Sequence, residues 1–220
     1  MTEQQHVYEK QVTKTIKLNY LLHLPRDYDT EPNKRWPLIF FLHGRGERGD
    51  DLELIKKHGI PRVTAEREDF PFIAVSPQCP ITSWWPVDTS ALNGLLDEIV
   101  LRHRVDTHRL YLTGISMGGY GVWRLALDYP ERFAAFAPIC GPSVLNLDNI
   151  GLLKSVPMWV FHGAKDSVVP IGHSERMVGA LKEIQADNLQ YTIYPDGEHN
   201  VWTETYNNPA LYEWLLEHKR

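Results

Sequence analysis

Cysteine is scarce in this chain, which has only Cys79 and Cys140 among its 220 residues. Two cysteines are too few for the disulfide framework that holds many small secreted domains together. Apolar residues, proline and glycine lie around them, so we predict that both thiols pack as small hydrophobic side chains. The sequence alone leaves open whether the two form a single disulfide.

Long apolar runs and an excess of basic charge are also missing. No stretch approaches 18 consecutive apolar residues, so no transmembrane helix and no membrane partner is expected. The net charge is −5, and lysines and arginines are scattered among acids, which argues against nucleic acid as a partner. The first residues, MTEQQHVYEKQV, lack the pattern of a signal peptide, so a cytoplasmic location is the default expectation.

The composition is that of an ordinary globular protein, with 43% hydrophobic and 23% charged residues. A chain of this length is able to bury a large core. It shows no internal repeat, low-complexity tract or long linker. We therefore predict a single domain over residues 1–220.

Short apolar runs alternate along the chain with longer segments of helical periodicity. Residues 11–24 alternate polar and apolar positions, as an edge strand or hairpin does, whereas WPLIFFLHG is apolar on both faces, as a central parallel strand is. Further strands are predicted at residues 72–76, 109–115, 133–139, 158–161 and 189–194, and helices at residues 51–58, 90–103, 118–129, 174–185 and 209–218. This alternation predicts an α/β protein with a mostly parallel central sheet flanked by helices on both faces. Ligands bind such sheets at the carboxyl ends of the strands.

The sequence G-x-S-x-G occurs at residues 114–118, between a predicted strand and a predicted helix. In such a turn the hydroxyl of Ser116 projects from the sheet edge, beside a helix N-terminus that favours negative charge. The alternative is a glycine-rich turn in which Ser116 only caps the helix. The strand–helix context favours a nucleophile.

A serine hydroxyl is a weak nucleophile, so it needs a base, and the base needs an orienting acid. Where a serine lies at a strand–helix turn of this kind, the chain order is serine, acid, histidine. Asp166 follows the predicted strand at 158–161, and His199 follows the strand at 189–194. We predict that Ser116 is the nucleophile, Asp166 the orienting acid and His199 the general base.

Other acids and histidines compete for these roles, because the chain has ten histidines and many aspartates. Asp196 and Asp148 are rival acids, and His162 and His173 are rival bases. His162 ends a strand and is expected to pack or to bond to backbone, while His173 lies too near Asp166 in sequence. Asp166 and His199 themselves have alternative interpretations as ordinary loop residues.

Two backbone N–H groups are needed to hold a developing oxyanion. Met117, directly after the nucleophile, is predicted to supply one. Arg45, in the loop His43-Gly-Arg-Gly46 after the WPLIFFLHG strand, is predicted to supply the other, with His43 as a structural hydrogen-bonding residue. Trp85 and Trp202 lie near these loops and are predicted to bind an aryl or sugar group, although packing within a small domain would also explain them.

Five segments, FLHGRGERG, SPQC, YLTGISMGGYGVWRLA, HGAKDSVVP and EHNVW, resemble the α/β-hydrolase superfamily over essentially the whole chain. They are most similar to its esterases and peptidases related to polyhydroxybutyrate depolymerases, feruloyl esterases and phospholipase/carboxylesterases. The resemblance implies a triad at Ser116, Asp166 and His199, and an oxyanion loop at 43–46. Many members carry a helical cap, but residues 141–156 are too few for one, so no large cap domain and an open site are expected.

The expected reaction is hydrolysis of a small-molecule carboxylic ester through an acyl-enzyme, without metal or organic cofactor. The sequence has no H-E-x-x-H, no cysteine pair with zinc spacing and no acidic calcium loop. A peptidase or thioesterase on the same scaffold is the alternative enzyme. A non-catalytic binding protein is the rival from another class, although such proteins usually lose a member of the triad. The oligomeric state is not predicted.

Overall fold

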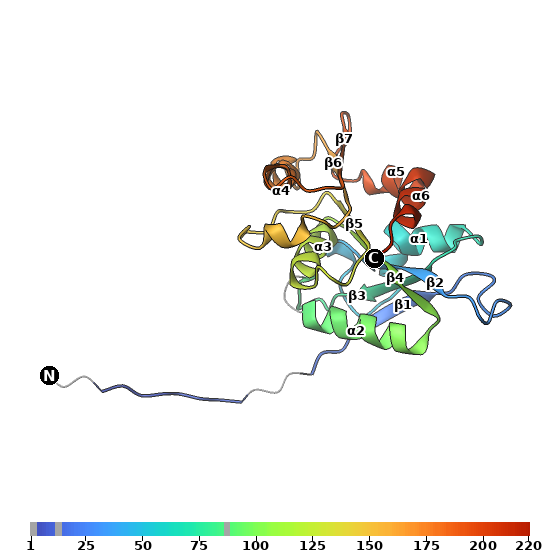
Figure 1. The fold of residues 1–220 in the computed structure, drawn as a ribbon, viewed down its shortest axis with the longest axis horizontal. Coiled ribbons are helices and arrows are strands. Elements are labelled where there is room, and N and C mark those ends of the chain that lie inside the picture. Colours follow the sequence, from blue (N-terminus) through green and yellow to red (C-terminus); the bar gives the residue numbers. More distant parts are fainter. Residues whose placement is uncertain (1–3, 12–14, 86–88) are drawn as a thin grey trace.

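The computed structural model describes residues 4–11, 15–85 and 89–220. Its centre is a seven-stranded sheet in the order β1-β3-β2-β4-β5-β6-β7 (Figure 1). The strands are β1 (Asn19–His23), β2 (Trp36–Leu42), β3 (Ile73–Gln78), β4 (Val105–Ile115), β5 (Ala135–Ile139), β6 (Met158–Gly163) and β7 (Leu189–Tyr194). Among the described strands, β1 alone pairs antiparallel, at the edge beside β3, and the other pairs are parallel.

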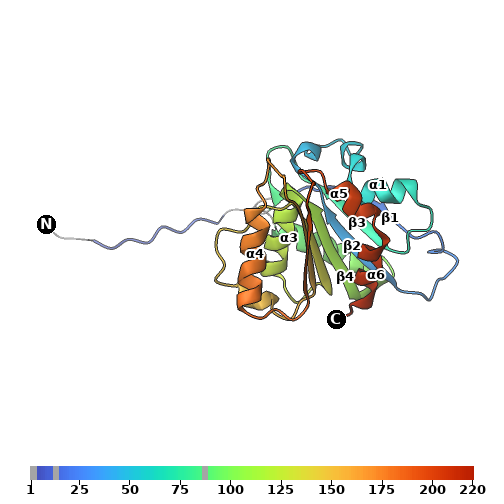
Figure 2. The same ribbon diagram turned by 90° about the horizontal axis from the view of Figure 1, so that it is seen from above.

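Helices cover both faces of this sheet, which confirms the predicted layered architecture (Figure 2). The helices are α1 (Gly59–Glu66), α2 (Thr89–Arg102), α3 (Met117–Asp128), α4 (Gly172–Glu183), α5 (Trp202–Asn207) and α6 (Pro209–Glu217). Buried side chains of α2, α3 and α4 pack on one face, and those of α1, α5 and α6 on the other. The division of residues 1–220 into one domain stays a prediction.

Strand β2 shows why the sheet is buried on both sides. All seven of its residues are buried. Leu38 and Phe40 belong to the core under α2, α3 and α4, whereas Ile39 and Phe41 belong to the core under α1 and α6. Complete burial of side chains of this size contributes about 1.5–3 kcal/mol each. The continuous apolar run is therefore the signature of a central strand.

Two helical segments differ from the prediction. The helix expected at 51–58 is only a 3₁₀ turn, η2 (Leu54–Lys57), and α1 begins at Gly59, where the prediction ended a helix. Gly59 has φ of +66°, and a Cβ there would lie 2.1 Å from Phe41 Cζ. Gly59 thus marks a close approach of chain to sheet. Helix α5, which follows His199 closely, was not predicted at all.

Other predictions concern the N-terminal strand, the two cysteines, the segment between β5 and β6, and membrane-spanning helices. Residues 12–14 of the expected N-terminal strand or hairpin lie outside the described residues, and the strand itself begins at Asn19. Both cysteines are buried, and no disulfide joins them. The segment between β5 and β6 contains one short 3₁₀ helix, η4 (Ile150–Leu153), and no cap domain. Among the described helices, none combines the length and apolarity needed to cross a bilayer.

Candidate active site

Ser116 lies in a sharp turn between β4 and α3, with φ of 52° and ψ of −116°. Positive φ is strained for a residue with a side chain and costs about 1–3 kcal/mol. Two glycines make the turn possible. A Cβ on Gly118 would lie 1.9 Å from the carbonyl oxygen of Leu42, and one on Gly114 would lie 2.7 Å from the backbone of Gly118. The G-x-S-x-G pattern is thus required by close packing against β2.

Ser116, His199 and Asp166 meet at the carboxyl ends of the strands. Ser116 Oγ lies 2.8 Å from His199 Nε2, and His199 Nδ1 lies 2.7 Å from Asp166 Oδ2. Because a carboxylate only accepts hydrogen bonds, Nδ1 carries the ring proton, and this N–H donates a hydrogen bond to Asp166. Nε2 is then free to accept from the serine hydroxyl. The order of hydrogen bonds is the one that activates a serine.

The loops that carry the acid and the base are joined by backbone contacts. Lys165 N–H donates to Gly197 O at 2.8 Å, and Ala164 N–H donates to Tyr194 O at 2.9 Å. Gly163, at the end of β6, packs so closely that a Cβ there would lie 2.3 Å from the carbonyl oxygen of Glu198. These contacts fix the distance between the two loops.

Asp166 is held by donors on both oxygens. Oδ1 accepts from the N–H groups of Val168 and Val169 at 2.9 and 2.8 Å. Oδ2 accepts from His199, and His162 Nε2 lies 3.3 Å from the same oxygen. The Asp166 side chain is completely buried, and hydrogen bonds to an ionised carboxylate are among the strong ones.

The rival acids and the rival base of α4 have other partners. Asp196 is an exposed residue paired with Lys165 at 2.6 Å, and Asp148 accepts from the side-chain amide of Asn146. His173 Nδ1 accepts from Ser143. The geometry therefore favours the predicted choice of Asp166 and His199.

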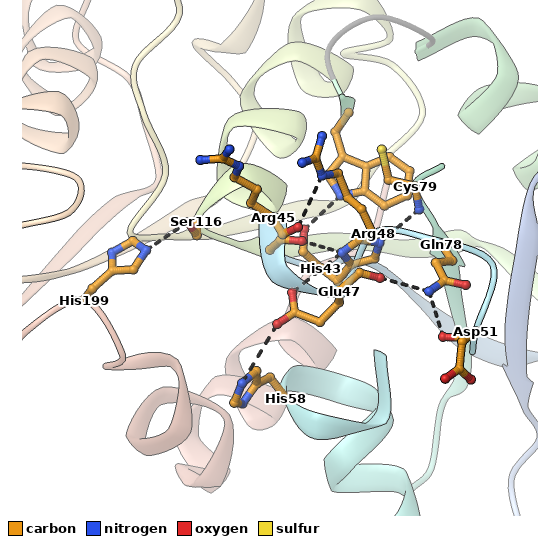
Figure 3. Close-up of polar contacts among 12 residues, drawn as sticks. His43, Arg45, Glu47, Arg48, Asp51, His58, Gln78, Cys79, Ser116 and His199 are labelled. Atoms are coloured by element: carbon orange, nitrogen blue, oxygen red, sulfur yellow. Dashed lines mark hydrogen bonds and ion pairs between the residues drawn. The ribbon is translucent and has the colours of Figure 1, made fainter. Parts of the chain in front are cut away.

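The loop after β2 is fixed by donors from the end of β3 and from the segment that follows it. Trp85 Nε1–H donates to His43 O at 2.9 Å, and Gln78 Nε2–H donates to Glu47 O at 2.9 Å. His43 Nε2 in turn accepts from Cys79 N–H at 2.9 Å, as the expected structural role of His43 requires (Figure 3). Two carbonyls of this loop are thus held by buried donors.

A cavity of about 340 Å³ opens at Ser116. Arg45 and Met117 line it, so both predicted oxyanion donors lie beside the serine. Its apolar walls are formed by the side chains of Trp84, Pro142, Val168, Val169 and Trp202. This is a largely apolar pocket with few charged groups, of the kind that accepts part of a small organic ligand.

The two predicted tryptophans are placed differently. Trp202 lines the cavity, with its ring 5.2 Å from that of His199 in an edge-on arrangement. Trp85 is only 3% exposed and lies beneath the loop after β2, with its indole N–H bonded to His43 O. Its neighbour Trp84 lines the cavity instead. The expected contact between Trp85 and substrate does not fit this position.

Sequence reasoning missed Glu47, a buried carboxylate in the cavity wall. It lies between two histidines, with His43 Nδ1 at 3.7 Å and His58 Nε2 at 3.9 Å (Figure 3). Burial alone would raise the pKa of Glu47, but the two histidines bring it below its ordinary value. The signal in the sequence is the acid that directly follows the His-Gly-Arg-Gly loop.

Cys140 lies on the acid side of the site, and its Sγ is within 4.8 Å of ligand atoms of Asp166 and His199. These residue types are able to bind metals. Burial raises the pKa of the Cys140 thiol to about 12, so the thiol is protonated in the metal-free site.

Comparison with known proteins links the chain to esterases. A family model described as "Putative esterase" matches residues 14–188. The chain is 26% identical to the "Bifunctional acetylxylan esterase/xylanase XynS20E" of Neocallimastix patriciarum over 88% of this chain and 28% of that protein. It is 27% identical to the "Probable feruloyl esterase C" of Aspergillus terreus, covering 78% of this chain and 62% of that protein.

The solved structure of "a Thermostable Esterase" superposes with a TM-score of 0.80 at 33% identity. The match covers 93% of this chain and 60% of that one. The chain spans about half or less of the length of several curated relatives that it matches.

Proposed function

The chain belongs to the esterase family, and on that premise we propose that it hydrolyses carboxylic esters through an acyl-enzyme on Ser116. Family membership and the sheet topology confirm the α/β-hydrolase fold and the esterase branch that the sequence resembles. The observation that carries the proposal is the pair of hydrogen bonds, 2.8 and 2.7 Å long, from Ser116 through His199 to Asp166.

In the proposed mechanism, Ser116 Oγ attacks the ester carbonyl while His199 Nε2 takes the hydroxyl proton. Asp166 stabilises the imidazolium that forms and keeps its ring oriented. The N–H groups of Arg45 and Met117 hold the oxyanion. His199 then gives its proton to the leaving alcohol, removes a proton from the attacking water, and returns that proton to Ser116 as the acid leaves. No step needs a metal or an organic cofactor.

The substrate class we propose is a small-molecule ester with an aromatic or sugar part. Trp84 and Trp202 provide flat apolar walls on which such rings pack. The names of two relatives, an acetylxylan esterase and a feruloyl esterase, describe esters of this kind and support the assignment. A cytoplasmic location stays a prediction.

The test is hydrolysis of p-nitrophenyl esters, from acetate to decanoate, and of a feruloyl ester by wild type and Ser116→Ala. We expect wild-type turnover, and a loss of about 10⁴-fold or more in the variant because the nucleophile is gone. Equal activity of both proteins would disprove the role of Ser116. Matched thioester and amide substrates compare the proposal with the thioesterase and peptidase alternatives.

A further inference from the structure

A second histidine approaches the same oxygen of Asp166 that accepts from His199. His162 is completely buried in β6, with Nε2 2.8 Å from Val169 O and 3.3 Å from Asp166 Oδ2. We propose that His162 is a positioning residue, a neutral donor that keeps Asp166 aimed at His199, and that Ser174 fixes its tautomer. This inference rests on the triad of the proposed function.

The protons on His162 can be placed from its neighbours. Nε2 faces two acceptors, the Val169 carbonyl and the Asp166 carboxylate, so it carries the ring proton. A neutral imidazole then has a lone pair at Nδ1. Ser174 Oγ lies 2.6 Å from Nδ1 and is placed to donate to it. Ser174 is itself 1% exposed, at the start of α4, so water does not compete for this bond.

The neutral state of His162 matters for catalysis. Burial lowers the pKa of His162 below its ordinary value, which keeps the ring uncharged. A charged ring at this distance would offset the negative charge with which Asp166 stabilises the His199 imidazolium. A neutral N–H that is bonded to Val169 O and lies 3.3 Å from Asp166 Oδ2 attracts the carboxylate oxygen and leaves that charge in place.

The other groups around Asp166 fit the same interpretation. The N–H groups of Val168 and Val169 hold Oδ1. The Cys140 thiol, at the end of β5, faces the carboxylate in its protonated form because burial raises its pKa to about 12. Among the described residues with contacts to this carboxylate, His199 is therefore the group that changes charge during the proposed reaction.

The chain contains a matched control close by. His173, also in α4, forms the same kind of serine–histidine hydrogen bond, with Ser143 Oγ 3.1 Å from its Nδ1. That pair contacts neither Asp166 nor His199 in the described hydrogen bonds. A substitution of His173 removes a similar ring and a similar bond without touching the acid.

The experiment compares His162→Leu, which removes the donor, with His162→Gln, which keeps an N–H near the position of Nε2. The first readout is the second-order rate at which a fluorophosphonate probe labels Ser116, because it does not depend on the ester chosen. The others are kcat and KM on the best ester and the thermal unfolding midpoint. Ser174→Ala and His173→Leu complete the set.

We expect His162→Leu to lower the labelling rate and kcat about 10-fold, because Asp166 loses the polar N–H beside its Oδ2, with KM unchanged within about twofold. His162→Gln should recover most of the loss. Ser174→Ala should lower the labelling rate about fivefold, as expected for the loss of a neutral hydrogen bond. His173→Leu should lower it less than about twofold.

The proposal would be overturned if His162→Leu folds and its Ser116 is labelled at the wild-type rate. It would also be overturned if Ser116 is labelled as slowly in His162→Gln as in His162→Leu. If His162→Leu does not fold, Ser174→Ala decides, and a wild-type rate there overturns the fixed tautomer. A wild type that is labelled at Ser116 but cleaves no ester counts against the proposed function alone. In that case the labelling rates still test His162.

Discussion

Asp166 and Glu47 are both buried carboxylates near Ser116, and different forces hold them. Asp166 accepts from two backbone N–H groups and from His199, all within 2.9 Å. Glu47 has histidine nitrogens at 3.7 and 3.9 Å, and its Oε2 is buried without a hydrogen-bond partner among the described residues. Hydrogen bonds fix the direction of Asp166, whereas Glu47 is held by charge and packing, which have little directional preference.

The difference suggests what each carboxylate does. A group that must orient a catalytic ring needs directional bonds to a rigid frame. A carboxylate that only packs near two histidine nitrogens beneath a loop does not. We therefore expect substitutions on the Asp166 side to affect chemistry strongly, and those on the Glu47 side to affect it weakly.

The largest expected effect is that of Asp166→Asn. The variant keeps the shape of the side chain but loses the charge, and its amide disfavours the Nδ1–H tautomer of His199. We expect kcat to fall by about 10⁴-fold, measured on the best ester. The control is Asp196→Asn on the same loops, an exposed residue paired with Lys165, which should stay near wild type. Retention of a tenth of the activity by Asp166→Asn would contradict its assigned role.

The second prediction compares how well the protein tolerates an added methyl group near Asp166, in Gly163→Ala, and near Glu47, in Gly44→Ala. In Gly163→Ala the new Cβ would lie 2.3 Å from the backbone oxygen of Glu198, so two loops must separate. In Gly44→Ala it would lie 3.0 Å from Oε2 of Glu47, a side-chain atom that is able to move.

We expect Gly163→Ala to lower the free energy of unfolding by about 2–4 kcal/mol, and Gly44→Ala by about 1 kcal/mol or less. Urea unfolding measures both. Gly46→Ala, with open space at its Cβ, is the control. A larger loss in Gly44→Ala than in Gly163→Ala would reverse the comparison.

The same contrast explains what the sequence could and could not predict. Ser116, Asp166 and His199 can be proposed as a triad from the sequence because the order of strands and loops limits where such residues lie. The sequence predicts that Trp85 binds substrate, whereas Trp85 is buried and its neighbour Trp84 lines the cavity. The path of the loop after β3 decides which of the two faces the cavity, and the local sequence does not specify that path. Glu47 was missed because an acid in a polar loop is normally solvated.

The third prediction concerns Glu47→Gln and activity. Like Asp166→Asn, this change replaces a carboxylate with an amide. Here, however, the carboxylate oxygen Oε2 has no hydrogen-bond partner among the described residues. We expect kcat on the best ester to change about threefold or less, since the loop carbonyls stay bonded to Trp85 and Gln78. A loss approaching that of Asp166→Asn would mean that Glu47 takes part in the chemistry and that the comparison is wrong.

The smallest expected effect is the dependence of stability on pH due to Glu47. Its pKa is lower in the folded protein than the ordinary value of 4.5, because His43 and His58 outweigh the effect of burial. The unfolded chain therefore binds the proton first as pH falls below 4.5, so this carboxylate contributes stability above that pH and loses it as pH falls through the folded pKa. Free energies of unfolding at pH 3 to 7 for wild type and Glu47→Gln measure the effect. The wild-type curve should fall more steeply below pH 4.5 and run parallel to the variant above pH 6, and parallel curves throughout would show that Glu47 gains nothing from its two histidines.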